Sequence, residues 1–298
     1  MSHDAALTRL RSAVLAVSVL DDLDLTPTTT GVRLHGSSPV EIGWDEVAEA
    51  VGTHEPTGAV ARRRLAATLQ LHRAVAEAGP DAAALLGSAA RLLALPADHA
   101  LHPGPSWTQR VQRGGAVTCG VGVTGLTSDP DDVVPLPARV AAAAGARVQD
   151  WWPGLVVHAE RMGRLVVARL HRDHGAPSAR GGASPSRRPA GPHRQAVLRP
   201  VGGVDVPSLL TTATLRAHLA GADGTGMCAV AVPMRSRGWY DLAHVDPAYV
   251  AAAWSLTDPW DRGLDRPVLV TADEVVLPRA GGDPAAGLLS RGRPVARA

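Results

Sequence analysis

The densest group of polar and aromatic side chains in this sequence lies between residues 235 and 244. It contains two arginines, two aromatic residues, an aspartate and a histidine, namely Arg235, Arg237, Trp239, Tyr240, Asp241 and His244. Arginine and tryptophan bind anions and planar groups, and a histidine oriented by a carboxylate can act as an acid or a base. Two interpretations are open: a ligand site, or a surface loop in which Trp239 packs on the core and an arginine pairs with Asp241.

The sequence on either side predicts where this cluster lies. The apolar run from Cys228 to Met234 predicts a buried strand, and Asp246 followed by Pro247 is typical of a helix start. In sheets with helical connections, ligands bind where strands end and helices begin. If a small-ligand site exists, we therefore expect residues 235–244 to line it. The expected binding residues are Arg235, Arg237, Trp239 and Tyr240, and the catalytic candidates are His244 and Asp241.

Two further patterns carry weaker signals. Gly120, Gly122 and Gly125 form a G-x-G-x-x-G sequence, but an aspartate-rich loop follows it where a dinucleotide site needs a helix. Histidine pairs at 99/102 and 171/174 have a spacing that could share a metal on a helix. Neither pair has a third ligand nearby, so we expect no metal site and no cofactor.

The composition excludes several reaction classes. The 298 residues include no Lys, Asn or Phe, and arginine supplies all 30 cationic side chains, a bias typical of a GC-rich genome. Without lysine, pyridoxal phosphate, P-loop and protein-kinase chemistry cannot operate. Because no metal, nucleophile or phosphate signature is recognisable in the sequence, the leading hypothesis is a non-catalytic binding or interaction protein. The alternative is an enzyme that acts on a small anionic substrate through residues 235–244.

Hydrophobic periodicity predicts an α+β or mixed α/β protein. We expect a helical N-terminal region with helices at residues 5–20, 57–78 and 80–95. A β-rich middle follows, with a strand at 116–123 and a hairpin at about 155–170. A helix over 207–219 then opens a second α/β-like segment.

Composition also suggests boundaries along the chain. Residues 1–173 and 200–283 are expected to fold as an N-terminal domain and a C-terminal α/β segment. Between them, residues 174–199 contain five arginines and no acid and predict a disordered linker, and 284–298 predict a flexible basic tail.

The charge distribution and the absence of a membrane-spanning run limit the partners. Because the positive charge gathers in the expected linker and tail, specific nucleic-acid binding is not expected, and nonspecific contact by these arginine-rich arms is a third hypothesis. No apolar run is long enough to span a membrane, and no signal peptide is recognisable. We therefore expect a cytoplasmic protein with a small anionic ligand or a protein as its partner.

Overall fold

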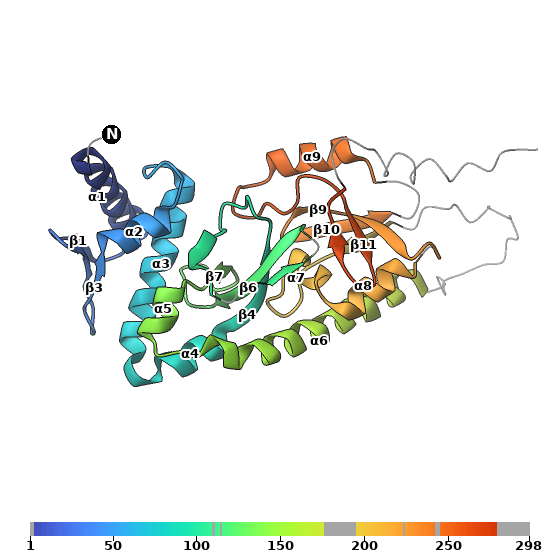
Figure 1. The fold of residues 1–298 in the computed structure, drawn as a ribbon, viewed down its shortest axis with the longest axis horizontal. Coiled ribbons are helices and arrows are strands. Elements are labelled where there is room, and N and C mark those ends of the chain that lie inside the picture. Colours follow the sequence, from blue (N-terminus) through green and yellow to red (C-terminus); the bar gives the residue numbers. More distant parts are fainter. Residues whose placement is uncertain are drawn as a thin grey trace, which may run out of the picture. The chain divides into compact units, whose positions relative to one another are not determined.

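The computed structural model describes residues 3–108, 111–113, 115–175, 195–222, 224–241 and 245–278. It confirms the expected α+β class, because helices are combined with three small antiparallel sheets (Figure 1). The chain forms two compact units. The first comprises Met1–Leu93, Ala97–Val111 and Cys119–Leu155, and the second Ala94–Pro96, Gln112–Thr118 and Val156–Ala298. The domain boundaries expected at residues 173 and 200 remain predictions.

The first unit opens with helices around a three-stranded antiparallel sheet in the order β1-β2-β3. These elements are α1 (His3–Leu20), β1 (Leu25–Pro27), β2 (Gly31–Leu34), β3 (Val40–Gly43), α2 (Trp44–Val51) and α3 (Ala59–Ala78). Their apolar side chains share one core, which includes Val14, Val32, Val47 and Leu65. The helices expected at 5–20 and 57–78 are confirmed.

The chain continues through a second small sheet with the order β4-β6-β5, in which β7 also pairs with β6. The elements of this stretch are η1 (Gly79–Asp81), α4 (Ala82–Ala89), β4 (Ala90–Leu95), η2 (Gly104–Ser106), β5 (Val111–Arg113), β6 (Val117–Thr124), β7 (Val133–Pro135), α5 (Ala138–Ala143) and α6 (Val148–Gly175). The helix expected over 80–95 is correct only as far as Ala89. Periodicity does not distinguish a short buried strand such as β4 from the last turns of a buried helix.

The hairpin expected at 155–170 is wrong, because this stretch belongs to the continuous helix α6. Five buried residues recur every three or four positions along it: Leu155, Ala159, Met162, Val166 and Leu170. The apolar doublets that suggested strand arms include Val157 and Leu165, which are exposed. Gly163, near the middle of this stretch, allows close packing, since a Cβ there would lie 2.6 Å from Oγ1 of Thr212.

The second unit is built on a five-stranded antiparallel sheet with the order β12-β11-β9-β10-β8. Its remaining elements are β8 (Gln195–Leu198), α7 (Val206–Leu210), α8 (Ala213–Ala220), β9 (Met227–Met234), β10 (Arg237–Asp241), α9 (Pro247–Leu256), β11 (Val268–Thr271) and β12 (Val275–Val276). The strand expected over 228–234 and the helix start at Asp246 are confirmed. The helix expected over 207–219 is two short helices, α7 and α8.

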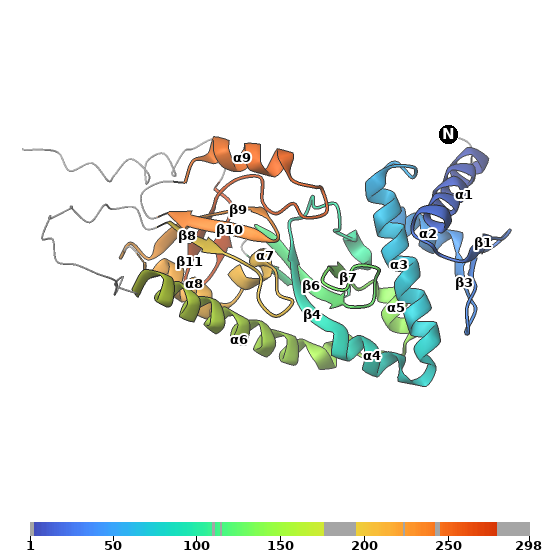
Figure 2. The same cartoon turned by 180° about the vertical axis from the view of Figure 1, so that it is seen from behind.

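The two faces of this sheet are covered to different extents. Helix α9 lies on one face, and α7 and α8 lie on the other (Figures 1 and 2). On the α7–α8 face the strand residues are fully buried, as Val230 and Leu198 illustrate, whereas Val197 and Trp239 on the α9 face are only half-buried. Val250 is the one buried residue within α9, and the rest of this alanine-rich helix covers its face incompletely.

Candidate functional site

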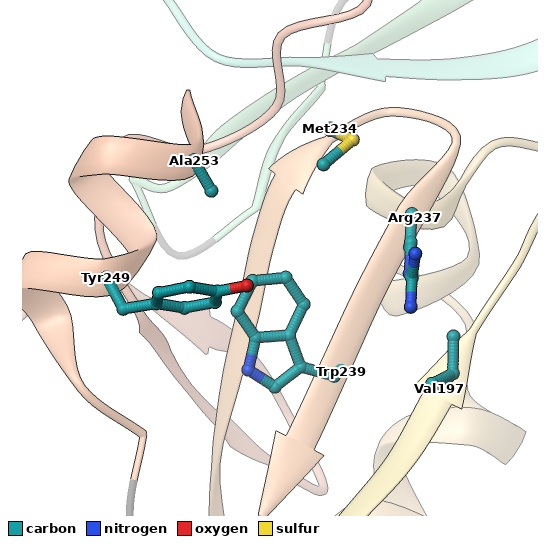
Figure 3. Close-up of a pocket in the computed structure, with 6 residues that line it drawn as sticks. All are labelled: Val197, Met234, Arg237, Trp239, Tyr249 and Ala253. Carbon is teal, nitrogen blue, oxygen red and sulfur yellow. The ribbon is translucent and has the colours of Figure 1, made fainter. Parts of the chain in front are cut away.

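A shallow groove of about 130 Å³ opens on the α9 face of the five-stranded sheet (Figure 3). Its lining comes from β8, β9, β10 and α9, through Val197, Met234, Arg237, Trp239, Tyr249 and Ala253. The ring centroids of Trp239 and Tyr249 lie 5.6 Å apart with their planes inclined by 60°. Figure 3 shows Tyr249 reaching from α9 toward the indole, with Arg237 on the other side of Trp239. The groove therefore combines an aromatic wall with one guanidinium group.

These side chains are placed in the groove by the alternation of residues along β10 and by the point at which α9 begins. Successive residues of a strand face opposite sides, so Trp239 points toward α9 while Tyr240, only 3% exposed, points into the α7–α8 side. Helix α9 begins after Asp246, whose side chain accepts a hydrogen bond of 2.9 Å from the backbone N–H of Ala248. Tyr249 and Ala253, one helical turn apart, then line the groove together.

Arg237 and Arg199 place two positive charges at one end of the β8–β10 pair. The last register pair at that end is Gly238 with Leu198, and the two arginines lie immediately beyond it. Arg237 is the first residue of β10, and Arg199 directly follows the last residue of β8. Both side chains are exposed. Within the described part of the chain, neither side chain makes a hydrogen bond or an ion pair. No described carboxylate is therefore hydrogen-bonded or ion-paired to either of these two guanidinium groups.

Arg235 has a different environment, although it is only two residues away in sequence. It is 5% exposed. Its Nε donates to Oδ2 of Asp205 at 2.8 Å, and its Nη1 donates to the carbonyl of Trp260 at 3.4 Å. Asp205 is also the N-cap of α7, where its Oδ1 accepts from the backbone N–H of Ser208 at 3.0 Å. The guanidinium of Arg235 thus joins three segments of the second unit and does not line the groove.

The structure brings two of the six sequence-derived site residues together in the groove, Arg237 and Trp239. Arg235 and Tyr240 face elsewhere, and the side chain of Asp241 and the whole of His244 lie outside the described residues. Residues 237–241 form the strand β10 and not the loop that the sequence suggested, because β9 continues into β10 through a tight hairpin in an antiparallel sheet.

Sequence reasoning missed four lining residues, Val197, Met234, Tyr249 and Ala253. The i, i+4 spacing of Tyr249 and Ala253 behind the helix start at Asp246 could have identified two of them. Val197 gave no such signal, because it reaches the groove through a strand pairing about forty residues away in sequence.

A second polar cluster surrounds Arg64 in the first unit. Its guanidinium donates to the backbone carbonyls of Ala50, Ala100 and His102 at 2.8 to 3.1 Å. Burial lowers the pKa of Arg64. The pKa of His54 is also lowered, by its own burial and then by the neighbouring Arg64 cation, while a hydrogen bond with Ala100 opposes this shift. Because the partners of Arg64 are backbone carbonyls, we interpret this cluster as a structural cross-link.

Two other properties concern the described residues as a whole. They contain no group of three or more His, Cys, Asp and Glu side chains placed to hold a metal ion. Their helices include none with the length and apolarity needed to cross a membrane.

No protein-family model matches the chain, and the comparisons with curated proteins and with solved structures gave no match. The functional argument therefore rests on the chemistry of the groove.

Proposed function

We propose that this protein is a non-catalytic binding protein whose Trp239 groove receives an apolar and acidic segment of a partner protein. The observation that carries the proposal is the convergence of Trp239, Tyr249 and Met234 beside Arg237 on the incompletely covered face of the sheet. Tryptophan, tyrosine, methionine and arginine are enriched at protein interfaces and among the residues that dominate their energetics. Tyr249 is 64% exposed and has apolar surface to bury against a partner.

The charge of the groove supports an acidic partner. Arg237 lines the groove and Arg199 stands at the same end of the β8–β10 pair, with no described acid bonded to either. A hydrogen bond between a guanidinium and a carboxylate is worth about 1.5–3 kcal/mol when it is shielded from water. A carboxylate from the partner is therefore the simplest complement to these two side chains.

The size and lining of the groove support a protein segment over a small substrate. Sites for small molecules usually enclose about 300–1,000 Å³ and bury most of their ligand. This groove is smaller, at about 130 Å³, and its lining residues include no carboxylate, imidazole or thiol. The enzyme hypothesis depends on the Asp241 side chain and on His244, which lie outside the described residues, and it remains a prediction.

Selection of displayed random peptides on the immobilised protein tests this proposal. We expect enriched peptides to combine acidic with aromatic or aliphatic residues. Their affinity should fall by about tenfold or more in the Arg237→Ala and Tyr249→Ala variants, because each removes an anchor of the groove. Both positions are exposed, so the variants should fold normally.

Arg164→Ala is the matched control, since Arg164 is an exposed arginine of the same unit on α6. Its peptide affinities should equal those of the wild type. The proposal fails if no peptide is enriched, or if the enriched peptides bind the Arg237 and Tyr249 variants as tightly as the wild type.

A further inference from the structure

The strand β8 ends the five-stranded sheet beside the groove, and among the described strands it has a neighbour on one side only. It pairs with β10 from Gln195↔Asp241 to Leu198↔Gly238. In an antiparallel pair, every second residue directs its backbone N–H and C=O away from the partner strand. No backbone hydrogen bond beyond the β10 pairing is found for β8 within the described residues. The outer edge of β8 therefore offers donors and acceptors to another strand.

The sequence of β8 lacks most of the features that protect sheet edges. Charged side chains, proline and bulges usually discourage the pairing of an exposed edge. The strand Gln-Ala-Val-Leu contains no charge and no proline, and its register with β10 is continuous. Its short length and the Arg199-Pro200 sequence that directly follows it are protective features, and they favour a limited, reversible contact over a permanent one.

The groove lies next to this edge, because β8 supplies one of its lining residues. Val197 is the register partner of Trp239 and lines the groove with it (Figure 3). A strand added beside β8 would lie about 4.8 Å from it and would direct alternate side chains to the face that carries Val197. A long apolar side chain at such a position reaches across Val197 toward Trp239.

We propose that the partner segment binds in an extended conformation, as an additional strand on the outer edge of β8, with an acidic side chain directed at Arg199 and Arg237. This inference rests on the proposed function, since it specifies how the partner of the Trp239 groove binds. Backbone hydrogen bonds to β8 supply affinity that does not depend on sequence, and the groove and the two arginines select the side chains.

Charge distinguishes an acidic segment of another protein from two other segments that could pair with β8, namely a second copy of the chain and the chain's own remaining residues. A second copy paired in parallel along β8 would bring its own Arg199 and Arg237 beside the first pair and add positive charge, and one paired antiparallel would place them at the far end, beside Gln195. The chain's own residues 176–194 contain four arginines and no acid, and its residues 279–298 contain four arginines and one acid, Asp283, so both segments are positively charged like the edge itself. An acidic segment of another protein is the occupant that the charges favour.

An N-methyl scan of a peptide selected on the wild-type protein tests the extended binding mode. Each backbone N–H of the peptide is replaced by N-methyl, one position at a time, and the affinity for the full chain is measured. Strand addition predicts alternation: methylation at every second residue should weaken binding by about tenfold, because it removes a hydrogen bond to β8, and the residues between should tolerate it.

The charge component is tested by Arg199→Gln. This variant should weaken an acidic peptide several-fold and should not affect the same peptide with its acids changed to amides, whereas Arg164→Gln should change neither affinity. Sedimentation checks whether a second copy takes the edge instead: a dimer that persists when saturating peptide is bound would show that the edge is already occupied by a second copy, and would overturn the inference.

The outcomes separate this inference from the proposed function. One outcome is that the selected peptides depend on Arg237 and Tyr249 but show a uniform or helical pattern of sensitivity to N-methylation. That result would support binding in the groove and would rule out strand addition to β8. Failure to obtain any groove-dependent peptide would reject both.

Discussion

Arg235 and Arg237 show how two identical residues, close in sequence, acquire opposite roles. Arg235 at the β9–β10 turn is buried and bonded to Asp205, whereas Arg237 is exposed at the groove. The sequence predicted both as anion-binding residues, because composition and spacing do not reveal a partner thirty residues upstream. Tertiary pairing therefore decides which arginine is available to a ligand.

The first prediction concerns the buried pair. Arg235→Ala should lower the free energy of unfolding by about 3–5 kcal/mol, because it leaves the Asp205 carboxylate buried without its cation. Urea unfolding measures the change. Arg237→Ala, at an exposed position, should stay within about 0.5 kcal/mol of the wild type.

A double-mutant cycle with Asp205→Ala identifies the source of the effect. If Arg235 acts through Asp205, the double variant should be much more stable than the sum of the two single losses implies. Additive losses would show that the two side chains contribute independently, contrary to the contact seen in the structure.

At the scale of elements, the sequence predicted α1, α3 and β9 but not the long helix α6. The helices at 5–20 and 57–78 and the strand at 228–234 were correct, because apolar residues recur at helical spacing in the helices and run continuously in the strand. Helix α6 was mistaken for a hairpin because its apolar doublets resemble strands. The buried positions of α6 follow helical spacing, but the exposed Val157 and Leu165 concealed that pattern.

Helix α6 also supplies the cap of another helix. The N-cap residue of α8, Thr212, makes no capping bond, since its hydroxyl donates to the carbonyl of Leu209. Glu160 of α6 takes over this role. Its Oε1 accepts from the N–H of Ala213 at 2.5 Å, and its Oε2 accepts from the N–H and the hydroxyl of Thr214 at 3.2 and 2.9 Å. A carboxylate is well suited here, because the first N–H groups of a helix have no partner within the helix.

We therefore predict that Glu160→Ala lowers the free energy of unfolding by about 1–2 kcal/mol, the usual cost of removing a helix cap. Glu160→Gln should lose less, because one amide oxygen can still accept a hydrogen bond. Urea titrations monitored by circular dichroism would give both values, with the adjacent exposed Arg161→Ala as the control for helix propensity. Equal stability of the Glu160→Ala and Arg161→Ala variants would contradict the capping role.

At the scale of the whole molecule, the sequence predicted the α+β class but not the groove. Strand β8 is the reason: it pairs residues 195–198 with residues 238–241, and such non-local pairing leaves no periodic signal in a four-residue segment. Trp239 and Arg237 were recognisable as binding residue types. Their convergence with Val197 and Tyr249 depends on the order of the strands, which local patterns do not encode.

The overall charge distribution gives the last prediction, which concerns nucleic acid. Residues 174–199 contain five arginines and no acid, while the whole chain has a formal net charge of only +2. If these arginines contact DNA nonspecifically, the logarithm of the binding constant should fall with the logarithm of the salt concentration, with a slope of about −0.9 for each phosphate neutralised. Replacing Arg180, Arg187, Arg188 and Arg194 by glutamine should then remove most of that slope, as measured by fluorescence anisotropy with labelled duplexes of different sequence.

The same variant should bind the groove-selected peptides as the wild type does, because the substitutions leave Arg199 and Arg237 in place. DNA affinity that survives the four substitutions, or that differs between duplex sequences, would instead assign nucleic-acid binding to other residues of the chain and would require the role of Arg199 and Arg237 to be reconsidered.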